Sequence, residues 1–184
     1  MPQDTDRLIV ITGGPGAGKT SLIEALAGLG HAVWPEAGRA IIRDQQAIGG
    51  RGLPWVDPAL FAELMLSSDL RGHAEARAGQ GKVFFDRGIP DIAGYLALCG
   101  LPIPDHVERA AQQLLYRRTV FIAPPWREIF TQDAERKQDF AEAERTCAAI
   151  AAAYPRYGYT LVALPRVSVA ARVSFVLDHL LAPE

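Results

Sequence analysis

The sequence predicts an α/β protein in which a parallel sheet lies between layers of helices. Short apolar segments alternate along the 184 residues with segments whose apolar residues recur at helical spacing. The apolar segments are continuous rather than alternating, which is typical of parallel strands that are buried on both faces. The first of these segments runs directly into a glycine-rich turn and then a helix, so the first unit of the fold is strand, turn and helix.

The expected elements follow one another in regular order. The expected strands are residues 7–12, 31–34, 82–85, 119–123 and 159–163. The expected helices are residues 22–29, 37–46, 92–98, 105–116 and 139–153, with two more that begin after Asp57 and after Ser168. Asp57 and Ser168 are good N-caps, and Pro58 suits a first helical turn. No repeat or linker divides the chain, so we expect residues 1–184 to form a single domain.

The glycine-rich turn has the pattern Gly13-x-x-x-x-Gly18-Lys19-Thr20, which is that of a P-loop. Such a turn aims successive backbone N–H groups into one concavity at the positive end of a helix dipole, where phosphates bind. Lys19 can reach the outer phosphates, and the Thr20 hydroxyl can ligate Mg²⁺. The residues expected to bind a nucleotide triphosphate are Gly13, Gly14, Pro15, Gly16, Ala17, Gly18, Lys19, Thr20 and Ser21.

Charged residues follow the second and third expected strands. In a parallel α/β sheet, ligands bind at the carboxyl ends of the strands. Asp86 is placed to hold Mg²⁺ there, Glu36 to act as a base, and Arg87 to meet the acceptor or its phosphates. Glu36 has an alternative role as an ion-pair partner of Arg39 or Arg43.

Asp91 has a structural interpretation. It follows Pro90 directly, and we expect it to cap the helix that begins at Ile92 rather than to bind metal. The four histidines are scattered, so the sequence indicates no metal other than Mg²⁺.

Residues 124–140 form a polar segment after the fourth strand. A solvated charged loop is one interpretation of this segment. We favour a lid that closes over the phosphates, because P-loop kinases carry a mobile lid at this position. Arg127 and Arg136 would then neutralise charge on the transferred group. The loop between Pro165 and Ser168 is expected to lie beside the purine base.

The composition excludes several classes of function. The net charge of −2 offers no general attraction to nucleic acid or to acidic membranes, and no apolar run is long enough to span a bilayer. Because the chain contains no asparagine, it lacks the Asn-Lys-x-Asp motif with which Ras-type GTPases read guanine. The N-terminal segment does not resemble a signal peptide, so we expect a cytoplasmic protein in which Cys99 and Cys147 are buried thiols.

Several motifs together resemble one known family. These are "GGPGAGKTS", "PEAGRAIIRDQ", "FFDRGIPD", "APPWREIFTQDAERKQDF" and "YGYTLVALPRVSVAARVSFVL". They are similar to the AAA-like P-loop family that includes the ribosylnicotinamide kinase domain of NadR. More distantly, Glu36 and Asp86-Arg87 resemble the base and the Mg²⁺-binding acid of deoxynucleoside kinases. The resemblance implies a three-layer α/β/α fold with the strand order 2-3-1-4-5.

The resemblance and the motifs lead to two expected functions. The first is ATP- and Mg²⁺-dependent phosphoryl transfer to a small hydroxyl acceptor, with a nucleoside such as nicotinamide riboside as one candidate. The second is a nucleotide-binding switch or slow NTPase that has no small-molecule acceptor. The sequence leaves open the identity of the acceptor, the choice between ATP and GTP, and the oligomeric state.

Overall fold

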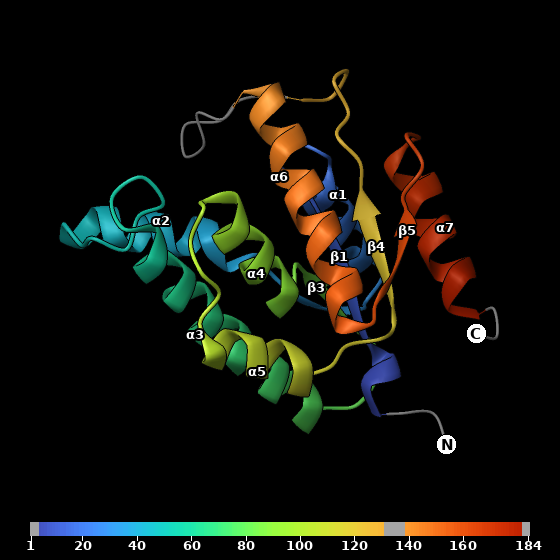
Figure 1. Cartoon of the computed structure of the whole chain (residues 1–184). Coiled ribbons are helices and arrows are strands. Elements are labelled where there is room, and N and C mark those ends of the chain that lie inside the picture. The colour runs from blue at the N-terminus through green and yellow to red at the C-terminus, as the bar shows by residue number, and fades with distance from the viewer. Residues whose placement is uncertain (1–3, 131–138, 182–184) are drawn as a thin grey trace.

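The computed structural model describes residues 4–130 and 139–181, and its centre is a five-stranded parallel sheet. The strand order is β2-β3-β1-β4-β5, which confirms the predicted order (Figure 1). The strands are β1 (Leu8–Gly13), β2 (Ala32–Trp34), β3 (Val83–Asp86), β4 (Thr119–Ala123) and β5 (Thr160–Ala163).

Helices cover both faces of this sheet. They are α1 (Lys19–Gly28), α2 (Ala37–Ile48), α3 (Pro58–Ala78), α4 (Ile89–Leu98), α5 (Asp105–Gln113), α6 (Phe140–Ala153) and α7 (Val169–Leu181), with short 3₁₀ helices at Asp4–Arg7 and Tyr154–Tyr157. Successive residues of a strand point to opposite faces. Leu8 and Val10 of β1 therefore pack against α3, α4, α5 and α6, whereas Ile9 and Ile11 pack against α1 and α7.

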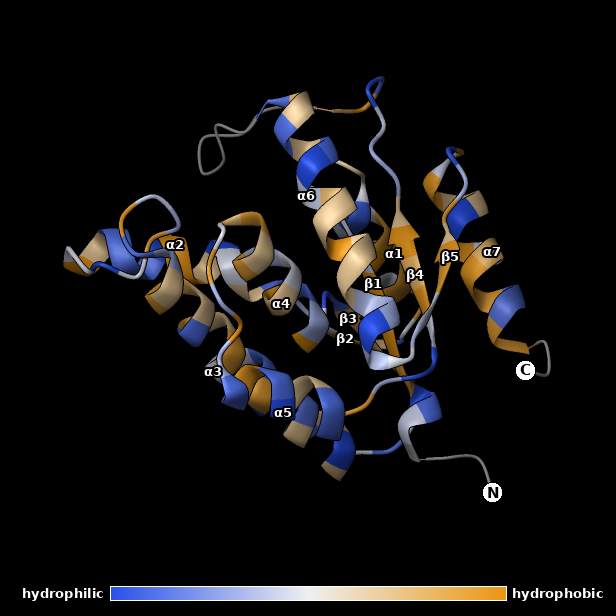
Figure 2. Cartoon of the chain, in the orientation of Figure 1, coloured by the Kyte–Doolittle hydropathy of each residue, from blue (hydrophilic) through white to orange (hydrophobic). Residues whose placement is uncertain are grey.

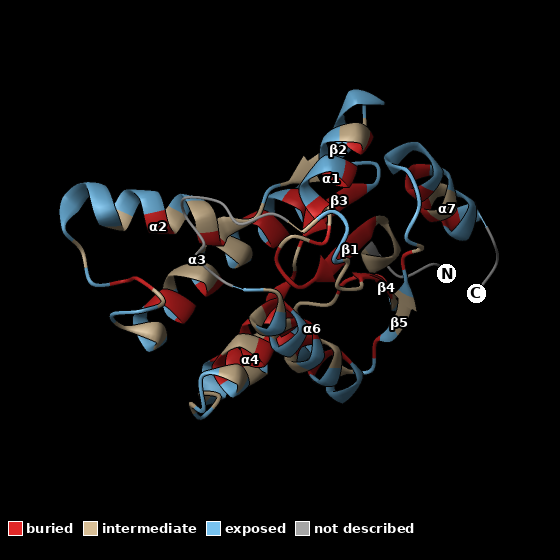
Figure 3. Cartoon of the chain, turned by 90° about the horizontal axis from the view of Figure 1, so that it is seen from above, coloured by how far each residue is buried: buried red, intermediate tan, exposed pale blue. Residues whose placement is uncertain are grey.

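The strands at the centre of the molecule are strongly apolar (Figure 2). Buried residues gather around β1 and β3, whereas the outer faces of α2 and α7 are exposed (Figure 3). A smaller apolar cluster formed by Ile42, Leu53 and Phe61 joins α2 to α3. The core therefore supports the carboxyl ends of β1 and β3, where the sequence predicts the ligands to bind.

Several helix boundaries differ from the prediction, and those of α4 and α5 have a clear cause. Helix α4 begins at Ile89 instead of Ile92, because Pro90 lies in the first turn, where its missing N–H breaks no helical hydrogen bond. Helix α5 ends at Gln113, short of Tyr116, because the chain turns there towards the sheet. The Arg117 N–H then donates to the Leu8 carbonyl at 2.8 Å, which places β4 beside β1.

The predicted helix caps at Asp57 and Ser168 are confirmed. The Asp57 carboxylate accepts a hydrogen bond from the Leu60 N–H at 3.0 Å, and the Ser168 hydroxyl accepts one from Ala171 at 3.3 Å. The prediction for the cysteines is only half right, since Cys147 is buried but Cys99 is exposed. Within residues 4–130 and 139–181, none of the helices has the length and apolar character that a membrane span requires.

Candidate active site

The P-loop connects β1 to α1, and its glycines are required by its close packing. A Cβ atom on Gly13 would lie 2.3 Å from the Ala123 carbonyl oxygen of β4, so only glycine fits there. Gly18 caps α1 with a φ of 77°, a left-handed conformation that glycine adopts at little cost. The turn therefore presents its backbone N–H groups at the start of a helix, as an anion site requires.

A cavity of about 390 Å³, here called the P-loop cavity, opens over this turn. Its lining residues are Pro15, Gly16, Ala17, Gly18, Lys19, Thr20, Ser21, Glu36, Arg39, Trp126, Ile129, Val167, Ser168, Val169 and Arg172. Lys19 is 5% exposed, and its Nζ donates to the Gly14 carbonyl at 2.7 Å. Val167 and Ser168 belong to the loop for which the sequence predicts a place beside the base, and they do line this cavity.

Arg172 of α7 ties that loop to the P-loop. Its Nη1 donates to the Ala17 carbonyl at 2.9 Å, and its Nε donates to the Pro165 carbonyl at 2.8 Å. Its guanidinium lies 4.8 Å from the centre of the Trp126 ring. Burial lowers the pKa of Arg172 from its ordinary value. Arg172 thus holds three sides of the P-loop cavity together.

A second cavity of about 350 Å³, here called the adjoining cavity, lies on the other side of Glu36. Its lining residues are Pro15, Glu36, Ala37, Gly38, Ile42, Pro54, Trp55, Phe61, Met65, Asp69, Asp86, Arg87, Asp91, Ile92, Gly94, Tyr95, Leu98, Glu142, Thr146 and Ile150. Pro15 and Glu36 line both cavities. A molecule in one cavity would therefore meet a molecule in the other beside the Glu36 carboxylate.

Glu36 and Arg87 form an ion pair at this junction. The Arg87 Nε donates to the Glu36 carboxylate at 3.2 Å, and Arg39 lies 3.9 Å from the other carboxylate oxygen. The sequence predicts Arg39 or Arg43 as alternative partners of Glu36. Arg39 lies beside the Glu36 carboxylate, whereas Arg43 is exposed. Burial alone would lower the pKa of Arg87, but the carboxylates of Glu36, Asp91 and Asp86 together raise it above its ordinary value.

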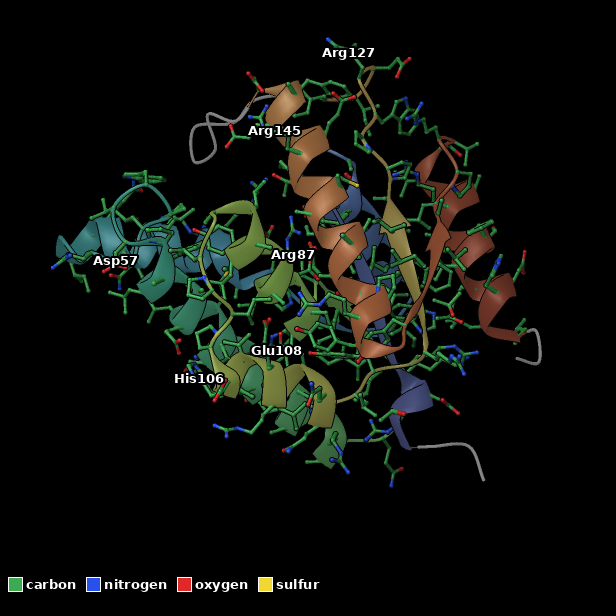
Figure 4. The ribbon with its side chains drawn as sticks, viewed as in Figure 1. Asp57, Arg87, His106, Glu108, Arg127 and Arg145 are labelled. Carbon is green, nitrogen blue, oxygen red and sulfur yellow. The ribbon has the colours of Figure 1, made fainter. Side chains whose placement is uncertain are left out.

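The backbone of Arg87 is strained. Its φ is 79°, the one positive value among the described residues other than glycine. A residue with a Cβ adopts this conformation at a cost of about 1–2 kcal/mol, and the surrounding contacts must supply that energy. Strain of this kind gathers at functional sites, and here it turns the Arg87 side chain into the middle of the molecule (Figure 4).

Asp91 is the second carboxylate that holds Arg87. It accepts a hydrogen bond from Arg87 Nη1 at 3.0 Å, from the Thr12 hydroxyl at 2.5 Å, from the Gly88 N–H at 3.0 Å and from the Tyr154 hydroxyl at 2.5 Å. The contact with Gly88 confirms that Asp91 caps α4, as predicted. The other three contacts join β1, α4 and the segment after α6 around one buried carboxylate.

Asp86 lies at the end of β3, beside Ile11 of β1. It is 7% exposed, and its Oδ1 atom has no hydrogen-bond partner among the described residues. Burial raises the pKa of Asp86, nearby Lys19 opposes that change, and Glu36 adds to it. A buried carboxylate oxygen without a partner is suited to a hydrated cation, so the chemistry of Asp86 fits Mg²⁺. Thr20, the other predicted ligand, lines the P-loop cavity, whereas Asp86 lines the adjoining one.

Asp69 of α3 is a site residue that the sequence analysis did not identify. Burial raises its pKa to about 8, Asp91 adds to the rise, and Arg87 opposes it. Phe61, Met65 and Asp69 recur at intervals of four residues and all line the adjoining cavity. An acidic residue in an otherwise apolar helical stripe is a signal that could have revealed it.

Arg127, the one lid arginine among the described residues, is not brought to the P-loop in this structure. Arg127 is exposed, lies apart from Arg87 at the other end of α6 (Figure 4), and places its guanidinium 4.2 Å from the centre of the Phe140 ring. It lines neither cavity as the described residues define them. Arg136 lies outside the described residues, as do residues 131–138 of the predicted lid at 124–140.

Tertiary packing thus assembles most, but not all, of the predicted site. Lys19 and Thr20 meet in the P-loop cavity, Asp86 and Arg87 lie in the adjoining cavity, and Glu36 lies between them. Trp126 and Arg172 were missed. Arg172 interrupts the apolar face of the last helix, and this interruption is the signal that could have found it.

Solved structures of several kinases share this fold. Deoxyadenosine kinase from M. mycoides, with products dCMP and dCDP bound, has a TM-score of 0.68 and 14% identity over 94% of this chain and 98% of that one. Thymidylate kinase from Candida albicans has a TM-score of 0.65 and 12% identity, over 94% and 90% of the two chains. NadR in complex with NR has a TM-score of 0.64 and 18% identity, over 95% of this chain and 50% of that one. A search of curated proteins found no match.

These likenesses, at 18% identity and below, establish the P-loop kinase fold. The family is established separately, by sequence. The model of the family described as "AAA domain" matches residues 8–172, which include the P-loop, Glu36, Asp86 and Arg172. The chain therefore belongs to this family of AAA domains and has the P-loop kinase fold, as its resemblance to the NadR-containing family implied.

Proposed function

We propose that the protein transfers the γ-phosphoryl group of ATP, with Mg²⁺, to a hydroxyl group of a small acceptor such as nicotinamide riboside. One observation carries this proposal: the P-loop cavity and the adjoining cavity meet at Pro15 and Glu36. A phosphoryl-transfer enzyme must hold a donor and an acceptor on either side of one point. The adjoining cavity beside Glu36 supports the proposal of an acceptor site.

The P-loop residues hold the donor. Backbone N–H groups between Gly13 and Thr20 bind the phosphates, and Lys19 exchanges its contact with Gly14 for one with the outer phosphates. Trp126 and the loop before α7 hold the base. Thr20 and Asp86 would hold Mg²⁺, which would neutralise charge on the phosphates.

Glu36 and Arg87 act on the acceptor. The acceptor hydroxyl gives its proton to the Glu36 carboxylate while its oxygen bonds to the γ-phosphorus and the bond to ADP breaks. Arg87 holds Glu36 in position at 3.2 Å and faces the same cavity, so its charge stabilises the transferred group. Arg127 and Arg136 add to this if the segment after β4 closes over the phosphates. We further propose a cytoplasmic protein that binds no nucleic acid.

A panel of hydroxyl compounds tests this function. Purified protein with ATP and Mg²⁺ is offered nucleosides, including nicotinamide riboside, together with phosphorylated metabolites, and ADP release is measured against the basal rate. We expect at least one nucleoside to raise ADP release about tenfold or more and to be recovered with an added phosphate. Omission of Mg²⁺ is the control. If no compound raises the basal rate, the protein is not a kinase for this class of acceptor.

A nucleotide-binding switch or slow NTPase is the second candidate. The observation in its favour is that both oxygens of Glu36 lie near arginines, Arg87 and Arg39, so the carboxylate also has a structural role. A switch would hydrolyse ATP slowly and show the same rate with every compound of the panel. The panel therefore separates the two candidates directly.

A further inference from the structure

The adjoining cavity is strongly acidic. Among its lining residues within the described chain are five carboxyl groups and a single basic side chain, that of Arg87. The carboxyl groups belong to Glu36, Asp69, Asp86, Asp91 and Glu142. Arg87 is already shared between Glu36 at 3.2 Å and Asp91 at 3.0 Å. Little positive charge is therefore left to bind an anionic group of an acceptor.

Most of these carboxyl groups have a partner or a task in the site. Asp91 accepts four hydrogen bonds, and Glu36 is paired with two arginines. Asp86 lies beside Lys19 at the end of β3, where the proposed function assigns it to Mg²⁺. Asp69 differs, because no described residue donates a hydrogen bond to it and its side chain faces the cavity.

The position of Asp69 defines a binding subsite. It follows Phe61 and Met65 along the cavity face of α3, so the carboxyl group lies at the end of an apolar wall. Phe61 packs edge to face against Tyr95 of α4, with 5.6 Å between the ring centres. The two rings therefore form one continuous apolar wall, on which a flat apolar ring can pack. A carboxyl group at the end of that wall can bind an N–H group on the edge of the ring.

We infer that the acceptor is an uncharged or cationic molecule carrying an N–H donor that binds Asp69, and that carboxylated and phosphorylated acceptors are rejected. This inference rests on the proposed function and specifies the substrate class of the same cavity. The described lining holds five carboxyl groups and one arginine, so an anionic group would meet a net negative charge, to which Asp69 adds once it has lost its proton. The arginine, Arg87, is already paired with Glu36 and Asp91, and the proposed function assigns it to the transferred phosphoryl group. An N–H donor instead satisfies a partly buried carboxyl group that otherwise has no partner.

Binding of matched ribosides tests the inference without relying on turnover. Nicotinamide riboside and nicotinic acid riboside have the same size, but the first carries an amide N–H₂ where the second carries a carboxylate. Cytidine and orotidine form a second pair in which only the latter has a carboxylate. Affinity is measured by calorimetry on the full chain in the presence of Mg²⁺ and a non-hydrolysable ATP analogue. We expect the uncharged or cationic member of at least one pair to bind about tenfold tighter or more.

Asp69→Asn tests the role of this residue. At pH 8.5, where Asp69 is mostly ionised, the substitution removes the charge and keeps the size. It should therefore reduce the preference within the pair about tenfold at this pH, mainly through tighter binding of the carboxylated member. Glu75→Gln is the matched control, because Glu75 is an exposed acid on the same helix outside the cavity. The control should keep the preference of the unmodified protein.

The pH dependence gives a second readout. The groups that act on Asp69 are Asp91, Glu36, Arg87 and the Tyr116 hydroxyl. With its pKa raised to about 8 in the empty cavity, Asp69 is mostly protonated at pH 6.5, and a cationic ligand must drive off that proton. The affinity for nicotinamide riboside should therefore rise about tenfold between pH 6.5 and pH 8.5, and Asp69→Asn should abolish this rise.

The outcomes separate this inference from the proposed function. A preference that depends on Asp69, without any phosphoryl transfer, supports the acceptor class and contradicts the kinase. Transfer with equal binding of both members of each pair supports the kinase and overturns the inference. The inference is also overturned if the carboxylated member binds more tightly, if Asp69→Asn keeps the full preference, or if no riboside binds.

Discussion

Seven of the fifteen described residues that line the P-loop cavity form one continuous stretch, 15–21. The adjoining cavity is instead assembled from β3, four helices and the loops between them, with no lining segment longer than three residues. The first presents backbone N–H groups whose direction depends on local turns. The second presents side chains from α2, α3, α4 and α6. The ionisation of its acidic groups, such as Asp69 and Asp86, depends on the charges of their neighbours.

This difference has a functional consequence. A site made of backbone groups binds phosphate whatever molecule carries it, so the P-loop cavity fits any nucleotide triphosphate. A site made of side chains from separate elements changes its selectivity when one residue changes. Under the proposed function, the adjoining cavity therefore selects the substrate, and the following predictions test the contrast between the two cavities.

Removal of the P-loop lysine should have the largest effect on activity. Lys19→Ala deletes the cation that faces the transferred phosphate, and we expect the rate of ATP turnover to fall about 10³-fold or more. The unfolding temperature should change little, because the Lys19 contact with Gly14 lies within the P-loop itself. Lys82→Ala, at an exposed lysine before β3, is the matched control. Normal turnover by a folded Lys19→Ala protein would remove the P-loop from the mechanism.

Substitution of Asp91 should lower the stability of the fold. Asp91→Ala leaves the Thr12 hydroxyl, the Gly88 N–H and the Tyr154 hydroxyl without their acceptor, and it leaves Arg87 with a smaller negative charge beside it. We expect the free energy of unfolding in urea to fall by about 3 kcal/mol. Asp44→Ala, at an exposed acid of α2, should leave it nearly unchanged. A loss below about 1 kcal/mol would mean that the adjoining cavity does not depend on this carboxylate.

Glu36 lies at the boundary between the two cavities and should separate their functions. Glu36→Gln cannot accept a proton, so transfer to an acceptor found in the panel should fall about 10²-fold, at the lower end of the effect of general-base catalysis. Nucleotide affinity should stay the same, because the P-loop contacts are kept. Glu24→Gln, on the exposed face of α1, is the control. Full transfer activity in Glu36→Gln would assign Glu36 to its ion pairs with Arg87 and Arg39 and not to the proton.

The smallest expected effect concerns the segment after β4. Trp126 and Ile129 line the P-loop cavity, and two turn hydrogen bonds of 3.3 Å are the backbone contacts between residues 126 and 130. A bound ATP analogue should slow amide hydrogen exchange in this segment about tenfold, since ordering is favourable only when phosphates and base are present. Exchange in α5, which lines neither cavity, should not change. Equal exchange with and without the analogue would argue against a closing lid.

The sequence alone was sufficient for the architecture and for the P-loop. Continuous apolar runs predict buried parallel strands, and all five lie within two residues of their predicted bounds. The motif from Gly13 to Thr20 predicts its own geometry, because the turn is made by neighbouring residues and its glycines are needed for close packing. The cap formed by Asp91 was predictable for the same reason, since its partner Gly88 is three residues away.

Only the tertiary structure decided what the acidic residues do. The partner of Glu36 at 3.2 Å is Arg87, which is 51 residues away in the chain, and the groups that raise the pKa of Asp69 lie on other elements. Desolvation and ion pairing depend on which elements pack together, and local sequence does not specify that. A carboxylate in the sequence is therefore a candidate for several tasks. In the folded protein, Asp91 is the centre of a hydrogen-bond network, Glu36 lies at the junction of the two cavities, and Asp69 has no hydrogen-bond partner among the described residues. Their roles differ because their neighbours differ.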